Sequence, residues 1–470
     1  MRQLLARFLP FLFLLVLAIV SGLFVPGFID PTNVANILRF SAVIVIMGAG
    51  MTFVIVSGGI DLSVGSVVAF SSIAAAWFIT ATGPAFAGLA KALRMSQATA
   101  TTLQILVTIL VGTLVGSLWG LLNGQLIAGI RLPRLTAALA TLLLASAAFA
   151  LWRWSMGAPP LWSVASGAGL AVLWTALYLL LADAVKLRPV AAMLITIALL
   201  AVTVFVLSLA ARIPAGGATF WRVLANAGPP LLHGLLAGIT VALFYALLAA
   251  GVRLPPFIAT LATMWLARGA ATLLARYITG LSTSIEVTTR GFEVLGGDAF
   301  HIPVLPSRAS PHGVPVPTPV LVMFAVVALS HYVLNHTRLG RYAFALGSNV
   351  DAARYSGISV SRYTILYYVL LGALAGLAGM IEASINRGGH ATLGREYELL
   401  VIAAVVIGGG SFQGGQGTIL GTLTGALIMA VIRNDCILTN VEYEWQLVVT
   451  SVLIVVAVAF DHFQRRRTGA

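Results

Sequence analysis

The stretch RLGRYAFALGSNVDAARYSGISVSR, from Arg338 to Arg362, is the most hydrophilic continuous segment in the C-terminal half of the chain. It lies between two apolar runs, and its composition excludes it from a bilayer. Asn349 is typical of a helix N-cap, Val350–Tyr355 can form one or two helical turns, and Gly357 is a suitable stop. The arginines of the stretch favour a cytoplasmic location. We therefore predict a short cytoplasmic helix between two membrane spans.

The composition is that of an integral membrane protein. Hydrophobic residues make up 60% of the 470 positions and charged residues 9%, against about 25% charged in an ordinary soluble domain. The net charge of +13 comes from scattered basic residues, which argues against nucleic acid as a partner. Cys436 is the only cysteine, so no internal disulfide can form. We expect one transmembrane domain over 1–470.

The apolar runs predict an all-α, polytopic helical bundle. A spanning helix needs about 20 apolar residues. The runs that fit lie near 8–25, 40–57, 64–82, 103–129, 134–151, 168–182, 189–211, 231–250, 257–279, 318–335, 363–385, 398–410, 417–433 and 445–462. The runs 168–182 and 398–410 are short enough to be half-spans. An even number of spans and arginines near both ends place both termini in the cytoplasm.

An internal repeat interrupts the chain. GIRLPRLTAALATLLLASAAFAL from Gly129 realigns with GVRLPPFIATLATMWLARGAATL from Gly251, an offset of 122 residues. We interpret this as a local duplication that inserted residues of about 131–252. Its apolar runs predict four extra membrane spans, added to about ten others. We expect peripheral membrane helices in this segment rather than a soluble domain.

Four ordered stretches carry a family resemblance. ALGSNVDAARYSGISV from Ala345 resembles the cytoplasmic coupling loop of ABC-transporter permeases of the ribose, xylose and simple-sugar class. Similar matches are GMTFVIVSGGIDLSVGSVVAF from Gly50, LPPFIATLATMWLARG from Leu254 and AAVVIGGGSFQGGQGTILGTLTGALIM from Ala403. The resemblance implies a permease subunit of an ATP-driven sugar importer in the bacterial inner membrane. It leaves the repeat segment unaccounted for.

The resemblance also implies partners. ATP would be bound and hydrolysed by separate ATPase subunits, a periplasmic protein would deliver the sugar, and a second permease copy or a related permease would complete the pore. The coupling loop would cover about 336–362, and its alternative role is a plain connector. The residues implied in contact with the ATPase are Arg341, Gly347, Asn349, Asp351, Ala352, Ala353, Arg354, Ser356 and Gly357.

Polar residues within apolar runs are candidates for a translocation path. Asp61, in SGGIDLSVGS, is interpreted as the N-cap of the helix that follows, or as part of a broken helix that lines the path. Glu382 lies four residues before Asn386, so the two share a helix face, and Arg268 is a possible ion-pair partner of Glu382. The candidates for the path are Asp61, Ser63, Asn123, Thr260, Thr263, Glu382 and Asn386.

The alternative function is an ion-coupled secondary transporter of a small polar solute, in which Asp61, Glu382 and Arg268 would form the ion site. The glycine-rich stretch Gly408–Gly417 has no Lys followed by Ser or Thr, so it is not a phosphate-binding loop. No spacing of Cys and His predicts a metal site, and no catalytic motif is present. We therefore expect a transport subunit with no cofactor of its own.

Overall fold

The computed structural model describes residues 2–129, 253–280, 283–302 and 314–468. The chain falls into two units: one is Met1–Ala128 with Leu254–Ala470, and the other is Gly129–Arg253. The segment predicted as an insertion at about 131–252, with its four predicted spans, lies outside the described residues.

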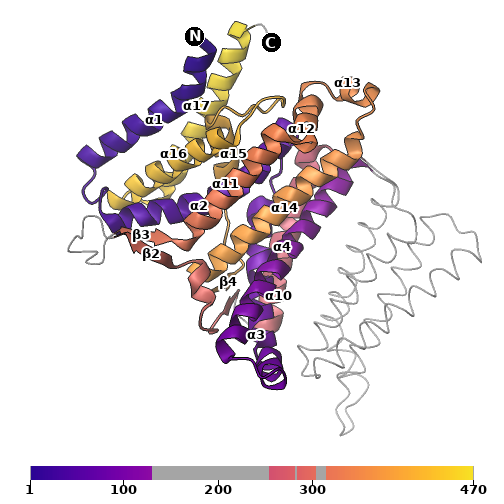
Figure 1. The fold of residues 1–470 in the computed structure, drawn as a ribbon. Coiled ribbons are helices and arrows are strands. Elements are labelled where there is room, and N and C mark those ends of the chain that lie inside the picture. Colours follow the sequence, from indigo (N-terminus) through magenta and orange to yellow (C-terminus); the bar gives the residue numbers. More distant parts are fainter. Residues whose placement is uncertain (1, 130–252, 281–282, 303–313, 469–470) are drawn as a thin grey trace, which may run out of the picture. The chain divides into compact units, whose positions relative to one another are not determined.

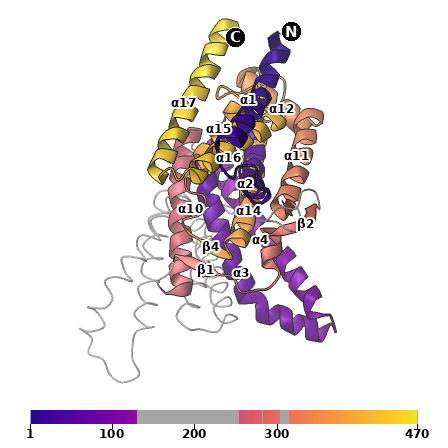
Figure 2. The same cartoon turned by 90° about the vertical axis from the view of Figure 1, so that its left-hand side faces the viewer.

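The first unit is a bundle of helices, shown from two sides in Figures 1 and 2. Each predicted span on described residues coincides with a helix, so the all-α, polytopic fold is confirmed. Seven of the described helices are long and apolar enough to cross a membrane. They are α2 (Pro31–Val56), α3 (Val64–Ala92), α4 (Gln97–Ala128), α10 (Pro256–Thr279), α11 (Thr318–His336), α14 (Val360–Ile385) and α16 (Ile419–Leu438).

Three further helices match predicted spans. Helix α1 (Arg2–Phe24) carries the apolar stretch Leu9–Phe24, and α17 (Tyr443–Thr468) is the last helix of the chain. Helix α15 (Tyr397–Ile407) has only 11 residues, about 16 Å at the usual rise of an α-helix. It is too short to cross the hydrocarbon core as a helix. The run near 398–410 was counted among the spans, and its helix has instead the length of the half-span that was noted as the alternative.

Helix α2 forms the centre of the unit, and every residue from Ser41 to Val56 is buried. Its start is fixed locally, because Pro31 occupies the first turn and Asp30 accepts a hydrogen bond of 2.9 Å from the backbone amide of Thr32. The hydrogen bonds from the Thr32 hydroxyl and amide lower the pKa of Asp30. Helices α11, α14, α15 and α16 pack around α2.

Helices α4 and α14 cross in close backbone contact, and they lie side by side in Figure 1. A Cβ atom on Gly116 would overlap the carbonyl oxygen of Gly372 and would lie 2.8 Å from the Cα atom of Gly376. A Cβ atom on Gly120 would overlap the carbonyl oxygen of Tyr368. Small residues at every fourth position let membrane helices approach this closely. The spacing of Gly112, Gly116, Gly120 and Gly124 therefore sets this crossing.

The described part of the segment Arg276–Pro317, between α10 and α11, contains short strands. Strand β1 (Ser284–Glu286) pairs with β4 (Gly388–His390), and β2 (Asp298–Ile302) pairs with β3 (Val314–Pro317), both antiparallel. A short 3-10 helix, η1 (Phe292–Leu295), lies between β1 and β2. Arg39 of α2 forms an ion pair of 2.6 Å with Asp298, which joins β2 to the first half of α2.

The described residues on either side of 130–252 are in direct contact. The backbone amide of Leu254 donates a hydrogen bond of 3.0 Å to the carbonyl oxygen of Leu126. Leu126 is in the last turn of α4, and Leu254 lies just before α10. The chain therefore leaves the first unit and returns to it at the same place.

Candidate functional site

The loop between α2 and α3 is a helix break that carries Asp61. Helix α2 ends at Val56, and α3 begins at Val64 with Ser63 as its N-cap. The Oδ1 atom of Asp61 accepts hydrogen bonds of 2.7 Å from both the amide and the hydroxyl of Ser63. The N-cap predicted at Asp61 is therefore wrong by two residues. The carboxylate closes a turn before the helix because it lies too early to reach the amides of the first turn of α3.

Asp61 also belongs to a buried hydrogen-bond network that joins three elements. The side-chain amide of Asn123, on α4, donates to Asp61 Oδ2 at 3.2 Å and to Ser63 Oγ at 2.8 Å. The hydroxyl of Thr263, on α10, donates to Asn123 Oδ1 at 2.6 Å. All four residues are buried. The structure thus brings together four of the predicted path residues, which we name the Asp61 network: Asp61, Ser63, Asn123 and Thr263.

The Asp61 network ties the helix break to α4 and α10 in this conformation. Both carboxylate oxygens of Asp61 accept hydrogen bonds, and both polar atoms of the Asn123 amide are paired. Thr260, one turn earlier on α10, donates its hydroxyl to the Pro256 carbonyl oxygen at 2.8 Å. Because these groups are buried and satisfied within the chain, a solute must replace existing hydrogen bonds to contact them.

Replacing Asp61 with alanine is expected to lower the free energy of unfolding by about 2 kcal/mol, because buried donors on Ser63 and Asn123 would lose their acceptor. Asp61→Asn should cost less, since the side-chain amide of Asn123 can rotate and accept from the new amide while donating to Thr263. Thermal unfolding of the two purified variants in detergent measures the difference. Equal melting temperatures for Asp61→Ala and the wild type would contradict a structural role for the network.

Glu382 and Asn386 form a separate set of hydrogen bonds at the end of α14. The Asn386 side chain donates to Glu382 Oε2 at 3.1 Å, and the Tyr397 hydroxyl donates to Glu382 Oε1 at 2.7 Å. The predicted pairing of Arg268 with Glu382 is wrong. Arg268 instead donates to the carbonyl oxygens of Ala391 and Leu393. The loop before α15 supplies the partners of Arg268, and Tyr397, the first residue of α15, supplies a partner to Glu382.

Several residues of this region were not found from the sequence. Tyr397 holds Glu382, and the Tyr368 hydroxyl donates to the carbonyl oxygen of Ile60 at 3.0 Å, next to Asp61. A hydroxyl on an apolar ring near membrane depth needs a hydrogen-bond partner, so Tyr368, within a predicted span, and Tyr397, next to one, were available signals. The sequence does not show which carbonyl or carboxylate accepts the bond.

The predicted coupling loop contains two helices. Helix α13 (Val350–Tyr355) agrees with the prediction, and the Asn349 side chain accepts a hydrogen bond of 2.9 Å from the Ala352 amide as its N-cap. Gly357 follows the helix, and its amide donates to the Arg354 carbonyl oxygen. Helix α12 (Arg338–Ser348) was not predicted. It buries Gly340, Ala343 and Leu346 and exposes Arg338 and Arg341, the pattern of an amphipathic surface helix.

Most of the residues of α13 that were implied in contact with the ATPase are exposed. Ala353, which is also one of them, is only 4% exposed and packs within this chain. Tyr355 is 90% exposed, and Asp351, Ala352, Arg354 and Ser356 are also exposed. Asp351 and Arg354 form an ion pair of 3.1 Å along the helix. The most exposed large side chain of α13 is therefore Tyr355.

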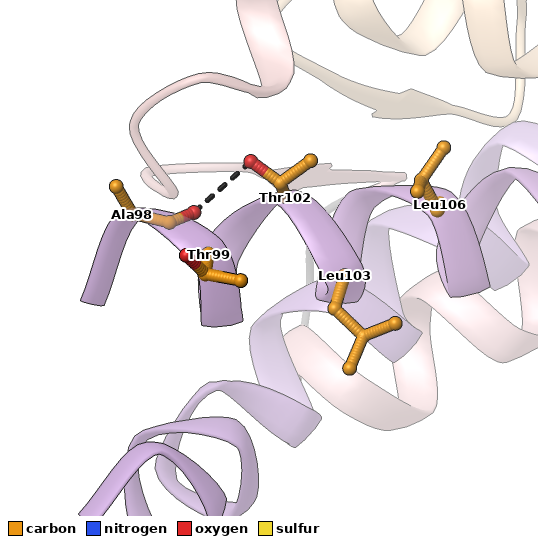
Figure 3. Close-up of a pocket in the computed structure, with 5 residues that line it drawn as sticks. All are labelled: Ala98, Thr99, Thr102, Leu103 and Leu106. Carbon is orange, nitrogen blue, oxygen red and sulfur yellow. Dashed lines mark hydrogen bonds between the residues drawn. The ribbon is translucent and has the colours of Figure 1, made fainter. Parts of the chain in front are cut away.

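A shallow hollow lies along the first turns of α4, away from these groups (Figure 3). Its described lining consists of Ala98, Thr99, Thr102, Leu103 and Leu106, and the Thr102 hydroxyl donates to the Ala98 carbonyl oxygen at 3.0 Å. None of these side chains is titratable. Over the described ranges, no group of three or more His, Cys, Asp or Glu residues could hold a metal ion.

Comparisons with known proteins support the resemblance found in the four motifs. The ribose import permease RbsC of Escherichia coli strain K12 is 38% identical over 255 residues, which are 54% of this chain and 75% of the relative. The ribose import permease of Bacillus subtilis is 40% identical over 212 residues, 44% of this chain and 60% of the relative. The galactose/methyl galactoside import permease MglC of E. coli K12 is 34% identical over 239 residues, 49% of this chain and 65% of the relative.

No solved structure matches the chain. The model of one protein family, described as the branched-chain amino acid transport system permease component, matches residues 33–154 and 204–458. These ranges contain the Asp61 network and helices α12 and α13. The predicted resemblance is thereby confirmed, and the chain belongs to this family of multi-pass membrane permeases.

Proposed function

We propose that this chain is the permease subunit of an ATP-driven importer of a monosaccharide. The observation that carries the proposal is the similarity to ribose and galactose import permeases. The residues that match the family model include all four motifs from which the function was first inferred. The protein's own task would be to form the path, and ATP would be hydrolysed by a partner chain. Membership of this family does not favour the ion-coupled alternative.

The arrangement along α2 supports two partners on opposite faces of the membrane. Arg39 holds the β2–β3 hairpin at one end of α2, and Gly347 of α12 contacts the other end at Val56. These two points are about 25 Å apart along a helix axis, close to the thickness of a bilayer core. We place α12 and α13 in the cytoplasm, against an ATPase, and the hairpin in the periplasm.

The outer partner would be a soluble protein that delivers the sugar. Large apolar side chains are exposed between α10 and α11, on the side that we place in the periplasm. They are Val294 of η1 and Phe300 and Ile302 of β2, and the acidic residues Glu293 and Asp298 lie next to them in the sequence or on the same elements. Exposed apolar groups with a polar rim are typical of a protein-docking surface. A second permease copy or a related chain would face this one across the pore. On this orientation both termini are cytoplasmic.

Reconstitution tests the proposed function. The permease is purified with a candidate ATPase and a candidate periplasmic sugar-binding protein from the same organism, and the three are placed in proteoliposomes. We expect uptake of labelled ribose or galactose that requires both partners and ATP and that persists when ionophores remove ion gradients. Uptake by the permease alone, driven by an ion gradient, would contradict the proposal and favour the secondary transporter.

A further inference from the structure

Three backbone segments are in direct contact, with no side chains between them, at the C-terminal end of α2. Gly347 of α12, Gly58 after α2 and Gly414 in the loop after α15 form this meeting point, which we name the glycine junction. A Cβ atom on Gly414 would lie 2.8 Å from the Cα atom of Gly347 and 3.1 Å from that of Gly58. A Cβ atom on Gly347 would overlap the carbonyl oxygen of Val56.

A hydrogen bond fixes the junction. The amide of Gly415 donates to the Val56 carbonyl oxygen at 2.8 Å, so the loop after α15 is bonded to the last turn of α2. Backbone atoms in direct contact cannot absorb a displacement by changing rotamer, whereas long side chains can. A shift of α12 must therefore move the end of α2 or open the junction.

The other end of the helix break is held by different helices. The Tyr368 hydroxyl, on α14, donates to the Ile60 carbonyl oxygen, and the next residue, Asp61, bonds to Asn123 of α4 and through it to Thr263 of α10. Residues 57–63 are thus attached at one end to the coupling helices and at the other to the Asp61 network. This short connection joins α12, which leads directly into α13, to the buried polar groups.

We propose that the glycine junction transmits movement of α12 and α13 to the α2–α3 break, and through the Asp61 network to α4 and α10. Gly58, Gly347 and Gly414 are positioning residues for transport, since they act through the groups they contact. The proposal rests on the proposed function, because it assumes that an ATPase moves α13. The alternative is that the glycines serve only for close packing, in which case the break would not respond to the ATPase.

A pair of loop glycines provides a matched test. Gly414 and Gly409 have similar backbone conformations, with φ of +84° and +89°, so alanine is strained at both. A Cβ atom on Gly409 has no neighbour within 4 Å, whereas one on Gly414 meets Gly347 and Gly58. Gly414→Ala should therefore lower binding-protein-stimulated ATP hydrolysis by about tenfold, while Gly409→Ala should retain the wild-type stimulation.

Two measurements separate this proposal from the proposed function. In the assembled wild-type complex, ATP binding should change amide hydrogen exchange both in residues 338–355 and in residues 57–63. In Gly414→Ala, the ATPase should remain bound and the change in 338–355 should persist, but the change in 57–63 should be lost. A wild-type complex in which ATP alters exchange in 338–355 and not in 57–63 overturns the proposal even if the variant does not fold.

If the binding protein stimulated ATP hydrolysis equally in Gly414→Ala and in the wild type, the proposed role of the glycine junction would also be overturned. Failure of the wild-type chain to bind any ATPase would instead overturn the proposed function. The two failures are therefore distinguishable in the same set of samples.

Discussion

Replacing Tyr355 with alanine is expected to uncouple transport from ATP hydrolysis. Tyr355 is 90% exposed at the end of α13, and a ring this exposed contributes little to the fold of its own chain. Truncating an aromatic anchor of an interface costs about 2 kcal/mol or more, which would weaken binding of the ATPase roughly thirtyfold. Co-purification of the ATPase with the variant, followed by binding-protein-stimulated hydrolysis, measures the loss.

The matched control is Tyr332→Ala. Tyr332, on α11, is also exposed, but it lies on a spanning helix rather than on α13. We expect this variant to bind the ATPase as the wild type does. If Tyr355→Ala bound the ATPase and supported stimulated hydrolysis as the wild type does, α13 would be a plain connector, which is the alternative that the sequence also allows. Ala353 is unsuitable for this test because its replacement would disturb packing within the permease.

Introducing one methyl group at Gly116 is expected to destabilise the protein strongly. The new Cβ atom would overlap the Gly372 carbonyl oxygen and would lie 2.8 Å from the backbone of Gly376. Neither neighbour is a side chain that can rotate away, so α4 and α14 must separate along their length. Overpacking typically costs about 1–3 kcal/mol, and contact with backbone places Gly116→Ala near the upper limit. Thermal unfolding in detergent measures the change.

Gly269→Ala is the control for this prediction. Gly269 is exposed on α10, and a Cβ atom there has no neighbour within 4 Å. Alanine favours the helix over glycine by about 1 kcal/mol, so Gly269→Ala should raise the melting temperature or leave it unchanged. If Gly116→Ala behaved like Gly269→Ala, the close crossing of α4 and α14 would be wrong.

The sequence predicted the features that depend on local chemistry. Apolar length identified the described spans, and Asn349 marked the start of α13 because a cap is decided within a few residues. Helix α12 was missed since its polarity was interpreted as loop, although Gly340, Ala343 and Leu346 have helical spacing. Glu382 and Asn386 share a face as predicted.

Predictions that required a partner far away in the chain were less successful. The carboxylate of Asp61 and the amide of Asn123 were both named as candidates, but nothing in the sequence places them in one network. Arg268 was paired with the wrong group because charge complementarity was considered and backbone carbonyls were not. The burial of Ala353 depends on how α13 packs against its own chain, which its local sequence does not reveal.

The hydrogen bond between Leu254 and Leu126 marks a position in the fold that can tolerate long insertions. The chain leaves and re-enters this unit at two residues that are adjacent in space. Residues can therefore be added or removed between them without moving α4 or α10. The entropic cost of a longer excursion rises only with the logarithm of its length. Permeases related to this one could therefore vary widely in size at this position while keeping the same transport machinery.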